Sequence, residues 1–256
     1  MQAEDFRVGQ WYRNRRGRFQ VLDSISDKLH VVYESGEKAS LDRQVSARII
    51  TNLETEEIAR IKEKLPQRLQ SDWLGTWNGE DFSLFKYLSF QRGWSAAASG
   101  DILAFKRGDC ETIEFFVGIM TTVIKGMESY LRETCKCRYL VAVPSSEARN
   151  VDGPGETLCS MVAENFKWLD HLPNALWRFK TIAKSSKATD HRPLIQDHMS
   201  SILYNGSVKD ATEESFVMFD DVITTKATSE ASRRLLKQST DCHSVKGFFL
   251  GKTSYR

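Results

Sequence analysis

The sequence predicts an α/β protein in which a mainly parallel sheet is preceded by a small β-barrel and a helical connector. Three observations lead to this prediction. Residues 101–256 alternate apolar strands with helical patterns, which is typical of a parallel sheet. Residues 1–52 hold several short runs of β-branched and aromatic residues. Residues 53–100 first show helical spacing and then a dense group of aromatic residues.

The composition is that of an ordinary globular protein. Of the 256 residues, 41% are hydrophobic and 27% charged, which excludes wholesale disorder. Thirty-six basic and 34 acidic residues leave a net charge of +2, so no overall positive field favours nucleic acid. The apolar runs are shorter than the roughly 20 residues of a membrane helix, and the first residues lack the pattern of a signal peptide. We therefore expect a cytoplasmic protein without membrane contact.

Short strands are expected near the N-terminus, over residues 18–24, 29–34 and 45–50. Closing them into a barrel would remove their exposed edges. The stretch 9–19 resembles the opening of Tudor-like or KOW-like barrels. Its arginines and aromatic residues could contact a nucleic-acid backbone, but residues 1–65 carry 12 basic and 11 acidic side chains. A protein or nucleic-acid partner for the barrel is left open.

The connector is expected to be helical and to pack on its neighbours. Ile58, Ile61 and Leu65 recur at helical spacing until Pro66 interrupts the pattern. The aromatic residues between 73 and 94 could stack on bases. Packing against the adjacent regions is the stronger interpretation, because large aromatic side chains bury the most area per residue.

The C-terminal region alternates helices and strands. Helices are expected over residues 111–132, 156–166 and 229–238, and strands over 139–143, 216–219 and 244–250. A polar, lysine-rich segment over 180–192 separates the two halves of this pattern. Taken alone, that segment is typical of a solvated surface loop.

An apolar run that ends in two acids and a threonine-rich turn carries the clearest chemistry. The run predicts a buried strand, whose carboxyl end would present Asp220 and Asp221 in the crevice where α/β proteins bind ligands. Hydroxyls at Thr224, Thr225 and Thr228 then surround the start of a helix, whose free N–H groups suit a phosphate. Carboxylates accept hydrogen bonds from vicinal diols and bind Mg²⁺ or its waters. A phosphorylated ribose meets both requirements.

The order Asp-Asp-Val-x-Thr-Thr-x-x-Thr after an apolar strand resembles the phosphoribosyl-diphosphate signature of type I phosphoribosyltransferases. The order of the surrounding elements is closest to the ComF-like branch. The resemblance spans about residues 102–252 and implies a phosphoribosyltransferase-like domain over 101–256. It implies that Asp220 and Asp221 contact the ribose hydroxyls and hold Mg²⁺ indirectly, together with the diphosphate substrate. It implies that the 5′-phosphate is bound by the turn, namely Thr224, Thr225, Lys226, Ala227 and Thr228.

Two further segments are similar to the elements with which this family binds diphosphate. A strand that ends in a Val-Pro turn leads into the first segment, and the lysine-rich stretch 180–192 corresponds to the family's flexible loop. Cations on such a loop could close over the departing diphosphate and exclude water. The resemblance implies diphosphate binding by Ser145, Ser146, Arg149, Lys184, Lys187 and Arg192.

Lysine stands at position 226, where the family's turn usually has glycine. Glycine is favoured where a backbone approaches a phosphate or adopts a positive φ. A lysine forced into the left-handed conformation costs on the order of 1 kcal/mol. The Lys226 ammonium would either add a phosphate contact or obstruct the cradle. The zinc-binding cysteines that open many ComF-like chains are also absent, so the partners of that branch do not carry over.

Other nucleotide-binding and hydrolytic classes fit the sequence less well. A Walker-B strand would need a P-loop, and the candidate at 247–253 has three residues between its glycines instead of four. A phosphatase or receiver domain would place an aspartate nucleophile in a different turn. No serine stands in a G-x-S-x-G motif.

The sequence leaves two functions open. One is a phosphoribosyltransferase that binds phosphoribosyl diphosphate and transfers the phosphoribosyl group to a nitrogen base, with release of pyrophosphate. The other is a catalytically inactive module that senses a nucleotide and regulates a partner through the barrel, for example in DNA uptake or bacterial defence. The acceptor base and the oligomeric state, a homo-oligomer included, are left open.

Overall fold

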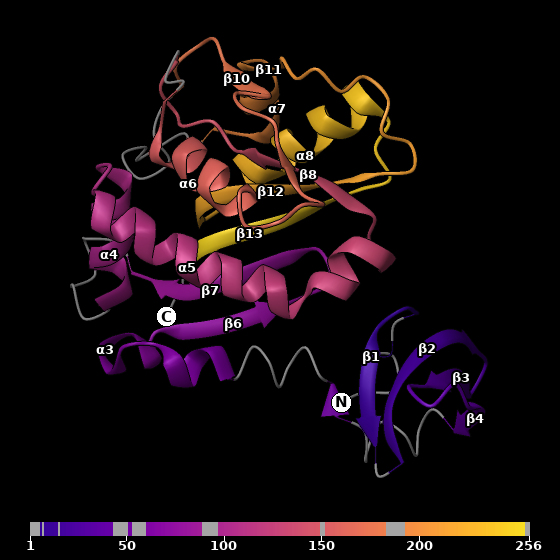
Figure 1. Ribbon diagram of the computed structural model, residues 1–256. Helices are drawn as coiled ribbons and strands as arrows, with labels where there is room; N and C mark the ends of the chain where they lie inside the picture. Colours follow the sequence, from indigo (N-terminus) through magenta and orange to yellow (C-terminus); the bar gives the residue numbers. More distant parts are fainter. Residues whose placement is uncertain are drawn as a thin grey trace. The chain divides into compact units, whose positions relative to one another are not determined.

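The structure of this chain is a computed structural model, which divides into two compact units (Figure 1). The smaller unit comprises residues 1–64 and 122–135, and the larger unit comprises 65–121 and 136–256. The residues that the structure describes are 6, 8–14, 16–42, 51–52, 60–88, 97–148, 152–182 and 193–253. Within them, no helix combines the length and the apolar character that crossing a bilayer requires.

The smaller unit contains an antiparallel sheet in the order β4-β3-β2-β1-β5. Its strands are β1 (Trp11–Asn14), β2 (Gly17–Ile25), β3 (Lys28–Tyr33), β4 (Lys38–Asp42) and β5 (Thr51–Asn52). Phe19 and Val21 are buried on one face of β2, as the two-residue period of a strand requires. The strands expected over 18–24 and 29–34 are confirmed, and the one expected over 45–50 lies outside the described residues.

The barrel is supported only as far as this sheet. Among the described residues, β4 and β5 are its two edge strands, and no ladder joins them. Closure into a barrel therefore stays a prediction. The smaller unit also contains a π-helical turn, η3 (Tyr130–Thr134).

The larger unit is built on a six-stranded sheet in the order β6-β7-β13-β12-β8-β9. The strands are β6 (Trp73–Trp77), β7 (Asp81–Tyr87), β8 (Cys137–Ala142), β9 (Asp170–His171), β12 (Ser215–Ile223) and β13 (Ser244–Thr253). Only β6 pairs antiparallel with its neighbour, β7. The carboxyl ends of the five parallel strands consequently meet at one edge of the sheet.

Helices cover both faces of this sheet (Figure 1). The described helices of this part of the chain include α3 (Gln67–Gln70), α4 (Ala97–Lys106), α5 (Cys110–Gly126), α6 (Pro154–Ala163), α7 (Ile195–Met199) and α8 (Ala227–Thr240). Of these, α3 packs against α4, and α7 packs against α8. On one face of β12, Met218 shares a buried core with Leu236 of α8. On the other face, the Phe219 ring lies 6.0 Å from that of Phe105 on α4 and next to Gly155 of α6. Successive side chains of β12 point to opposite faces of the sheet, so α8 packs on one face near its carboxyl end and α4 and α6 pack on the other.

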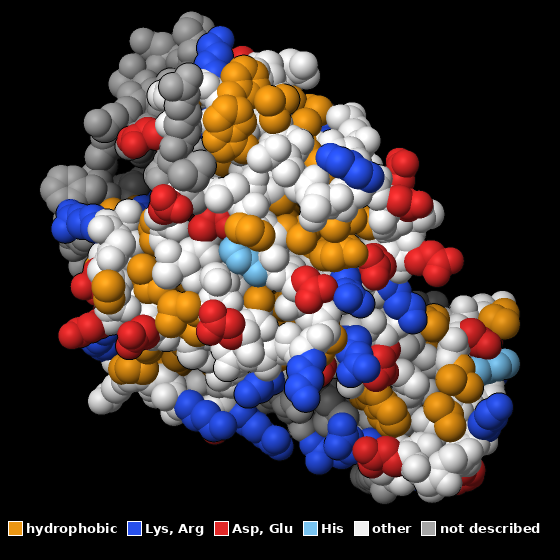
Figure 2. All heavy atoms as spheres, turned by 45° about the horizontal axis from the view of Figure 1, so that its top comes forward, with side chains coloured by type: hydrophobic (Ala, Val, Ile, Leu, Met, Phe, Trp, Pro, Cys, Tyr) orange, Lys and Arg blue, Asp and Glu red, His pale blue; other side chains and the backbone are white. Residues whose placement is uncertain are grey.

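A two-stranded ribbon, β10 (Leu176–Arg178) with β11 (Ile202–Tyr204), adjoins this core. Phe179, Leu194 and Leu203, which lie along the ribbon and before α7, are 40%, 70% and 49% exposed. Hydrophobic side chains also gather near the top of the face drawn in Figure 2. The larger unit therefore carries apolar surface beside the ribbon.

The prediction of a helical connector over 53–100 is wrong for much of that range. Residues 60–64 are helical and α3 is one turn long, but Trp73–Trp77 and Asp81–Tyr87 are the strands β6 and β7. β7 pairs in parallel with β13, which follows it by more than 150 residues in the chain. Asn78-Gly79 between two aromatic-rich runs is a local hairpin signal for β6 and β7, which pair antiparallel. Only the pairing of β7 with β13 depends on a partner that is distant in sequence.

The elements expected in the C-terminal region are confirmed, with shifted ends. β8, β12, β13, α6 and α8 coincide with them, and β12 continues to Ile223, so the acid pair lies inside the strand. Val222 and Ile223 still pair with β13, which explains the extension. The helix expected over 111–132 is interrupted. α5 ends at Gly126, a residue type with weak helix propensity, and after Met127 the backbone is helical again at 128–129 and continues into η3.

Candidate functional site

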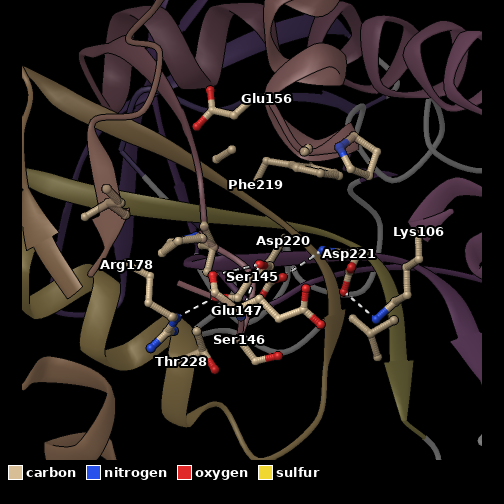
Figure 3. Close-up of a pocket in the computed structure, with 18 of the residues that line it drawn as sticks. Lys106, Ser145, Ser146, Glu147, Glu156, Arg178, Phe219, Asp220, Asp221 and Thr228 are labelled. Atoms are coloured by element: carbon tan, nitrogen blue, oxygen red, sulfur yellow. Dashed lines mark hydrogen bonds and ion pairs between the residues drawn. The ribbon is translucent and has the colours of Figure 1, made fainter. Parts of the chain in front are cut away.

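A pocket of about 500 Å³ lies at the carboxyl edge of the parallel sheet (Figure 3). Its walls come from the ends of β7, β8 and β12, the last turns of α4, and the first turns of α6 and α8. Crevices outside the carboxyl ends of parallel strands are where α/β sheets bind ligands. The position of the pocket follows from strand direction alone.

The acid pair projects into this pocket from the end of β12. The Asp220 carboxylate accepts a hydrogen bond from the Asp221 backbone N–H at 2.9 Å, and the Asp221 carboxylate forms an ion pair with the Lys106 ammonium at 2.9 Å. Burial and the adjacent Asp221 carboxylate raise the pKa of Asp220 to about 8, against the opposing effect of Lys106. Burial opposes the charge of Lys106, but the Asp221 carboxylate outweighs it, so the pKa of Lys106 is raised.

The threonine-rich turn joins the acid pair to α8. Thr224 and Thr228 line the pocket, whereas Thr225 is exposed and Ala227 is buried at the start of the helix. The Glu230 N–H donates the first hydrogen bond of the helix, to the carbonyl of residue 226. The N–H groups of the three preceding residues therefore have no acceptor within α8, as at any helix start. The turn offers hydroxyls and backbone N–H groups beside the acids.

Lys226 adopts the left-handed conformation, with φ 64° and ψ 0°, immediately before α8. Its ammonium lies 3.4 Å from the carboxylate of Asp81 on β7, which also pairs with Arg233 at 2.6 Å. The side chain of Lys226 is not part of the pocket wall. The conformation is thus the one for which glycine is favoured, while the lysine side chain leaves the pocket open.

We expect Lys226→Gly to stabilise the fold by about 0.5–1 kcal/mol, because it relieves the left-handed strain. The ion pair that it removes is half exposed at the lysine and contributes little. Thermal denaturation measures the change, and titration with ribose 5-phosphate measures binding, which we expect to be unchanged. Lys136→Gly is the matched control, since Lys136 has φ 56° and lies outside the pocket wall. Weaker binding in the Lys226 variant alone would mean that its side chain contacts the ligand.

The segment after β8 also lines the pocket. Ser145 and Ser146 line the pocket, as the sequence predicts, and Arg149 lies outside the described residues. The Ile182 N–H donates to the Ser146 carbonyl at 3.1 Å, and the Thr181 hydroxyl accepts from the Ala148 N–H at 2.9 Å. The loop is therefore anchored to the chain that follows β10.

Two buried side chains that the sequence analysis did not assign to the site also line the pocket. Arg178 is 2% exposed and donates hydrogen bonds to the Ser145 carbonyl and the Ser201 hydroxyl. Burial lowers the pKa of Arg178 to about 10. His198 lies 3.4 Å from both an Arg178 nitrogen and the Thr228 hydroxyl, and burial with the nearby guanidinium lowers the pKa of His198 to about 4. Neutral His198 and charged Arg178 thus link the loop after β8, at Ser145, to the start of α8, at Thr228.

Acidic side chains outnumber basic ones in the described pocket wall. Glu147, Glu156, Asp220 and Asp221 face two cations, Lys106 and Arg178. Glu156 is engaged by His171 at 2.9 Å. The other cations that the sequence predicts for the site, Lys184, Lys187 and Arg192, lie outside the described residues. Among the described residues, no cluster of three or more metal-ligating side chains occurs.

Comparison with known proteins gives weak structural matches only. No family model matches the chain, and no curated protein matches it. The adenine phosphoribosyltransferase of Leishmania donovani matches with a TM-score of 0.35 and 13% identity, covering 59% of this chain and 68% of that one. The adenine phosphoribosyltransferase of Leishmania tarentolae matches with a TM-score of 0.36 and 12% identity, covering 69% of this chain and 94% of that one. A third adenine phosphoribosyltransferase matches with a TM-score of 0.31 and 18% identity, covering 55% of this chain and 74% of that one. At these identities the matches assign a role to none of the site residues.

Proposed function

We propose that this chain binds phosphoribosyl diphosphate and transfers its phosphoribosyl group to a nitrogen base, with release of pyrophosphate. The observation that carries the proposal is the continuity of β12, the acid pair, the left-handed turn and the start of α8 along one wall of the pocket. Carboxylates suit ribose hydroxyls, and a helix N-terminus suits a phosphate. The Val-Pro turn after the first core strand supports a proposed assignment to the ComF-like branch, which the order of elements in the sequence resembles.

Each part of the ligand has a complementary part of the site in this proposal. Asp220 and Asp221 accept hydrogen bonds from the ribose hydroxyls. The 5′-phosphate is bound by the N–H groups and hydroxyls of the turn over 224–228. The diphosphate lies toward Ser145 and Ser146, within reach of the positive charge of Arg178.

The transfer needs no covalent bond to the protein. The bond between C1 of the ribose and the diphosphate oxygen breaks, and its electron pair leaves with the diphosphate. The lone pair of the base nitrogen forms the new bond to C1, and the proton of that nitrogen passes to solvent. The acids and the turn hold the sugar in place while positive charge develops at C1, and that positioning supplies much of the rate enhancement.

We propose Mg²⁺ as the cofactor, bound together with the diphosphate. The wall has more carboxylates than cations among its described residues, so an incoming diphosphate requires added positive charge. Carboxylate oxygens at Asp220 and Asp221 are hard ligands that suit Mg²⁺ through its waters. When bound, Mg²⁺ would neutralise charge on the leaving diphosphate.

Calorimetric titration combined with a pyrophosphate-release assay tests this function. The protein is mixed with phosphoribosyl diphosphate and MgCl₂, and then with a panel of purine and pyrimidine bases. We expect saturable, magnesium-dependent binding and pyrophosphate release with at least one base. Binding without release for every base would instead support the nucleotide-sensing alternative. Absence of binding to both phosphoribosyl diphosphate and ribose 5-phosphate would contradict the proposal.

A further inference from the structure

Lys106 reaches the acid pair from a part of the chain well before the segment 220–228 that holds the acids and threonines. It is the last residue of α4, and its ammonium lies 2.9 Å from one carboxylate oxygen of Asp221. Both side chains line the pocket and are about one-third exposed, at 36% and 30%. Figure 3 shows Lys106 pointing toward Asp221, on the side of the acid pair away from Arg178. The ion pair therefore belongs to the ligand-binding surface.

The position of Lys106 is fixed by packing. Its neighbour Phe105 is 1% exposed and makes edge-to-face contacts with Phe219 and with Phe116 of α5. Ile102, one turn earlier on α4, is fully buried. Because α4 is held against the sheet, the Lys106 stem starts from a defined place beside the end of β12. A cation held in this way is preorganised for a ligand.

We propose that Lys106 and Asp221 together recognise one ribose hydroxyl, and that this makes the site specific for ribose over deoxyribose. The inference rests on the proposed function. A hydroxyl is both a donor and an acceptor, so it can donate to the Asp221 carboxylate while its oxygen accepts from Lys106. The ammonium has three N–H donors, and the ion pair uses one direction. A deoxy sugar would leave this charged pair without its partner, which is costly in a partly buried site.

The test is a cycle of protein variants against sugar phosphates. Binding of ribose 5-phosphate, 2-deoxyribose 5-phosphate and 3-deoxyribose 5-phosphate is measured by calorimetry for the unmodified protein, Lys106→Met and Lys106→Gln. Lys167→Met is the control, because Lys167 is an exposed lysine outside the pocket wall. Far-ultraviolet circular dichroism and melting curves establish that each variant is folded.

We expect Lys106→Met to weaken ribose 5-phosphate binding about tenfold, the usual effect of one lost charge-assisted hydrogen bond. One of the two deoxy sugars lacks the hydroxyl that Lys106 and Asp221 recognise. The affinity for that sugar should be nearly the same in Lys106→Met as in the unmodified protein. Lys106→Gln, which keeps an N–H donor without the charge, should bind ribose 5-phosphate with intermediate affinity. The control variant should match the unmodified protein.

An equal loss of affinity for all three sugars in the Lys106 variants would overturn the inference, since a purely structural countercharge to Asp221 acts on every ligand alike. No loss for any sugar would overturn it as well. Both outcomes leave the proposed function standing. If the unmodified protein bound none of the sugar phosphates, the proposed function itself would fail.

Discussion

Replacing Asp220 and Asp221 together by Asn is expected to weaken ribose 5-phosphate binding at least about a hundredfold. At pH 9, above the pKa of Asp220, each carboxylate that accepts from a sugar hydroxyl contributes about 1.5–3 kcal/mol as a charged hydrogen-bond partner, and every 1.4 kcal/mol is about tenfold in affinity. An amide of the same shape keeps one acceptor oxygen but presents N–H donors and no charge. Calorimetric titration measures the affinity.

A matched control exists at the other end of the same strand. Glu213 and Glu214 are an adjacent acid pair just before β12, and neither lines the pocket. Their double replacement by Gln should leave the affinity unchanged. Undiminished binding in the Asp220 and Asp221 double variant would remove the acid pair from the site.

The second large effect is on stability, and it depends on pH. The pKa of Asp220 is raised to about 8 in the folded protein by burial and by Asp221, and it returns to about 3.9 in the unfolded chain. Between these values the folded state binds the extra proton, so stability falls as the pH rises from about 4 to about 8. Asp220→Asn removes the ionisable group. We therefore expect the variant to gain on the order of a few kcal/mol over the unmodified protein above pH 8.

Chemical denaturation at pH 4, 7 and 9 measures this difference. The two proteins should differ little at pH 4, where Asp220 is protonated in the folded state and about half protonated in the unfolded chain, and the variant should be the more stable at pH 9. A stability difference that is independent of pH would contradict the assigned electrostatics. Higher stability in Asp220→Asn, beside the binding lost in the double variant, is the trade-off typical of functional groups held in an unfavourable environment.

Much of the site could be predicted because its residues are consecutive in the chain. The acids and threonines between 220 and 228 follow a strongly apolar strand, and such a local pattern fixes both the strand and the start of the next helix. The structure places Asp220, Asp221, Thr224 and Thr228 in the lining of the pocket, together with Ser145 and Ser146 from the loop after β8. Their roles in binding remain predictions.

The remaining residues of the site could not be found in this way, because long-range packing brings them to it. Lys106 ends a helix that precedes the acid pair by more than 100 residues, and no local signal distinguishes it from a surface lysine. Arg178 stands between two aromatic residues on a three-residue strand, and only the tertiary structure shows that it is buried beside the loop. The parallel pairing of β7 with β13 is long-range in the same way, although the hairpin of β6 and β7 has a local signal in Asn78-Gly79.

Lys226 depends both on the local sequence pattern and on long-range packing. Glycine in the family that this turn resembles indicates either a close backbone approach or a positive φ, and the structure has φ 64° at Lys226. The direction of the side chain depends on Asp81, which comes from β7 and could not be placed from sequence. Whether the turn is open to a phosphate is therefore decided by a strand from a distant part of the chain.

The central claim is that the turn between β12 and α8 binds a sugar phosphate. A crystal structure of the protein with ribose 5-phosphate and MgCl₂ tests it most directly. The account predicts the phosphate within hydrogen-bond distance of the backbone N–H groups over 225–228, with the ribose hydroxyls on Asp220 and Asp221. Phosphate bound elsewhere, or a turn that stays empty at saturating ligand, would contradict it.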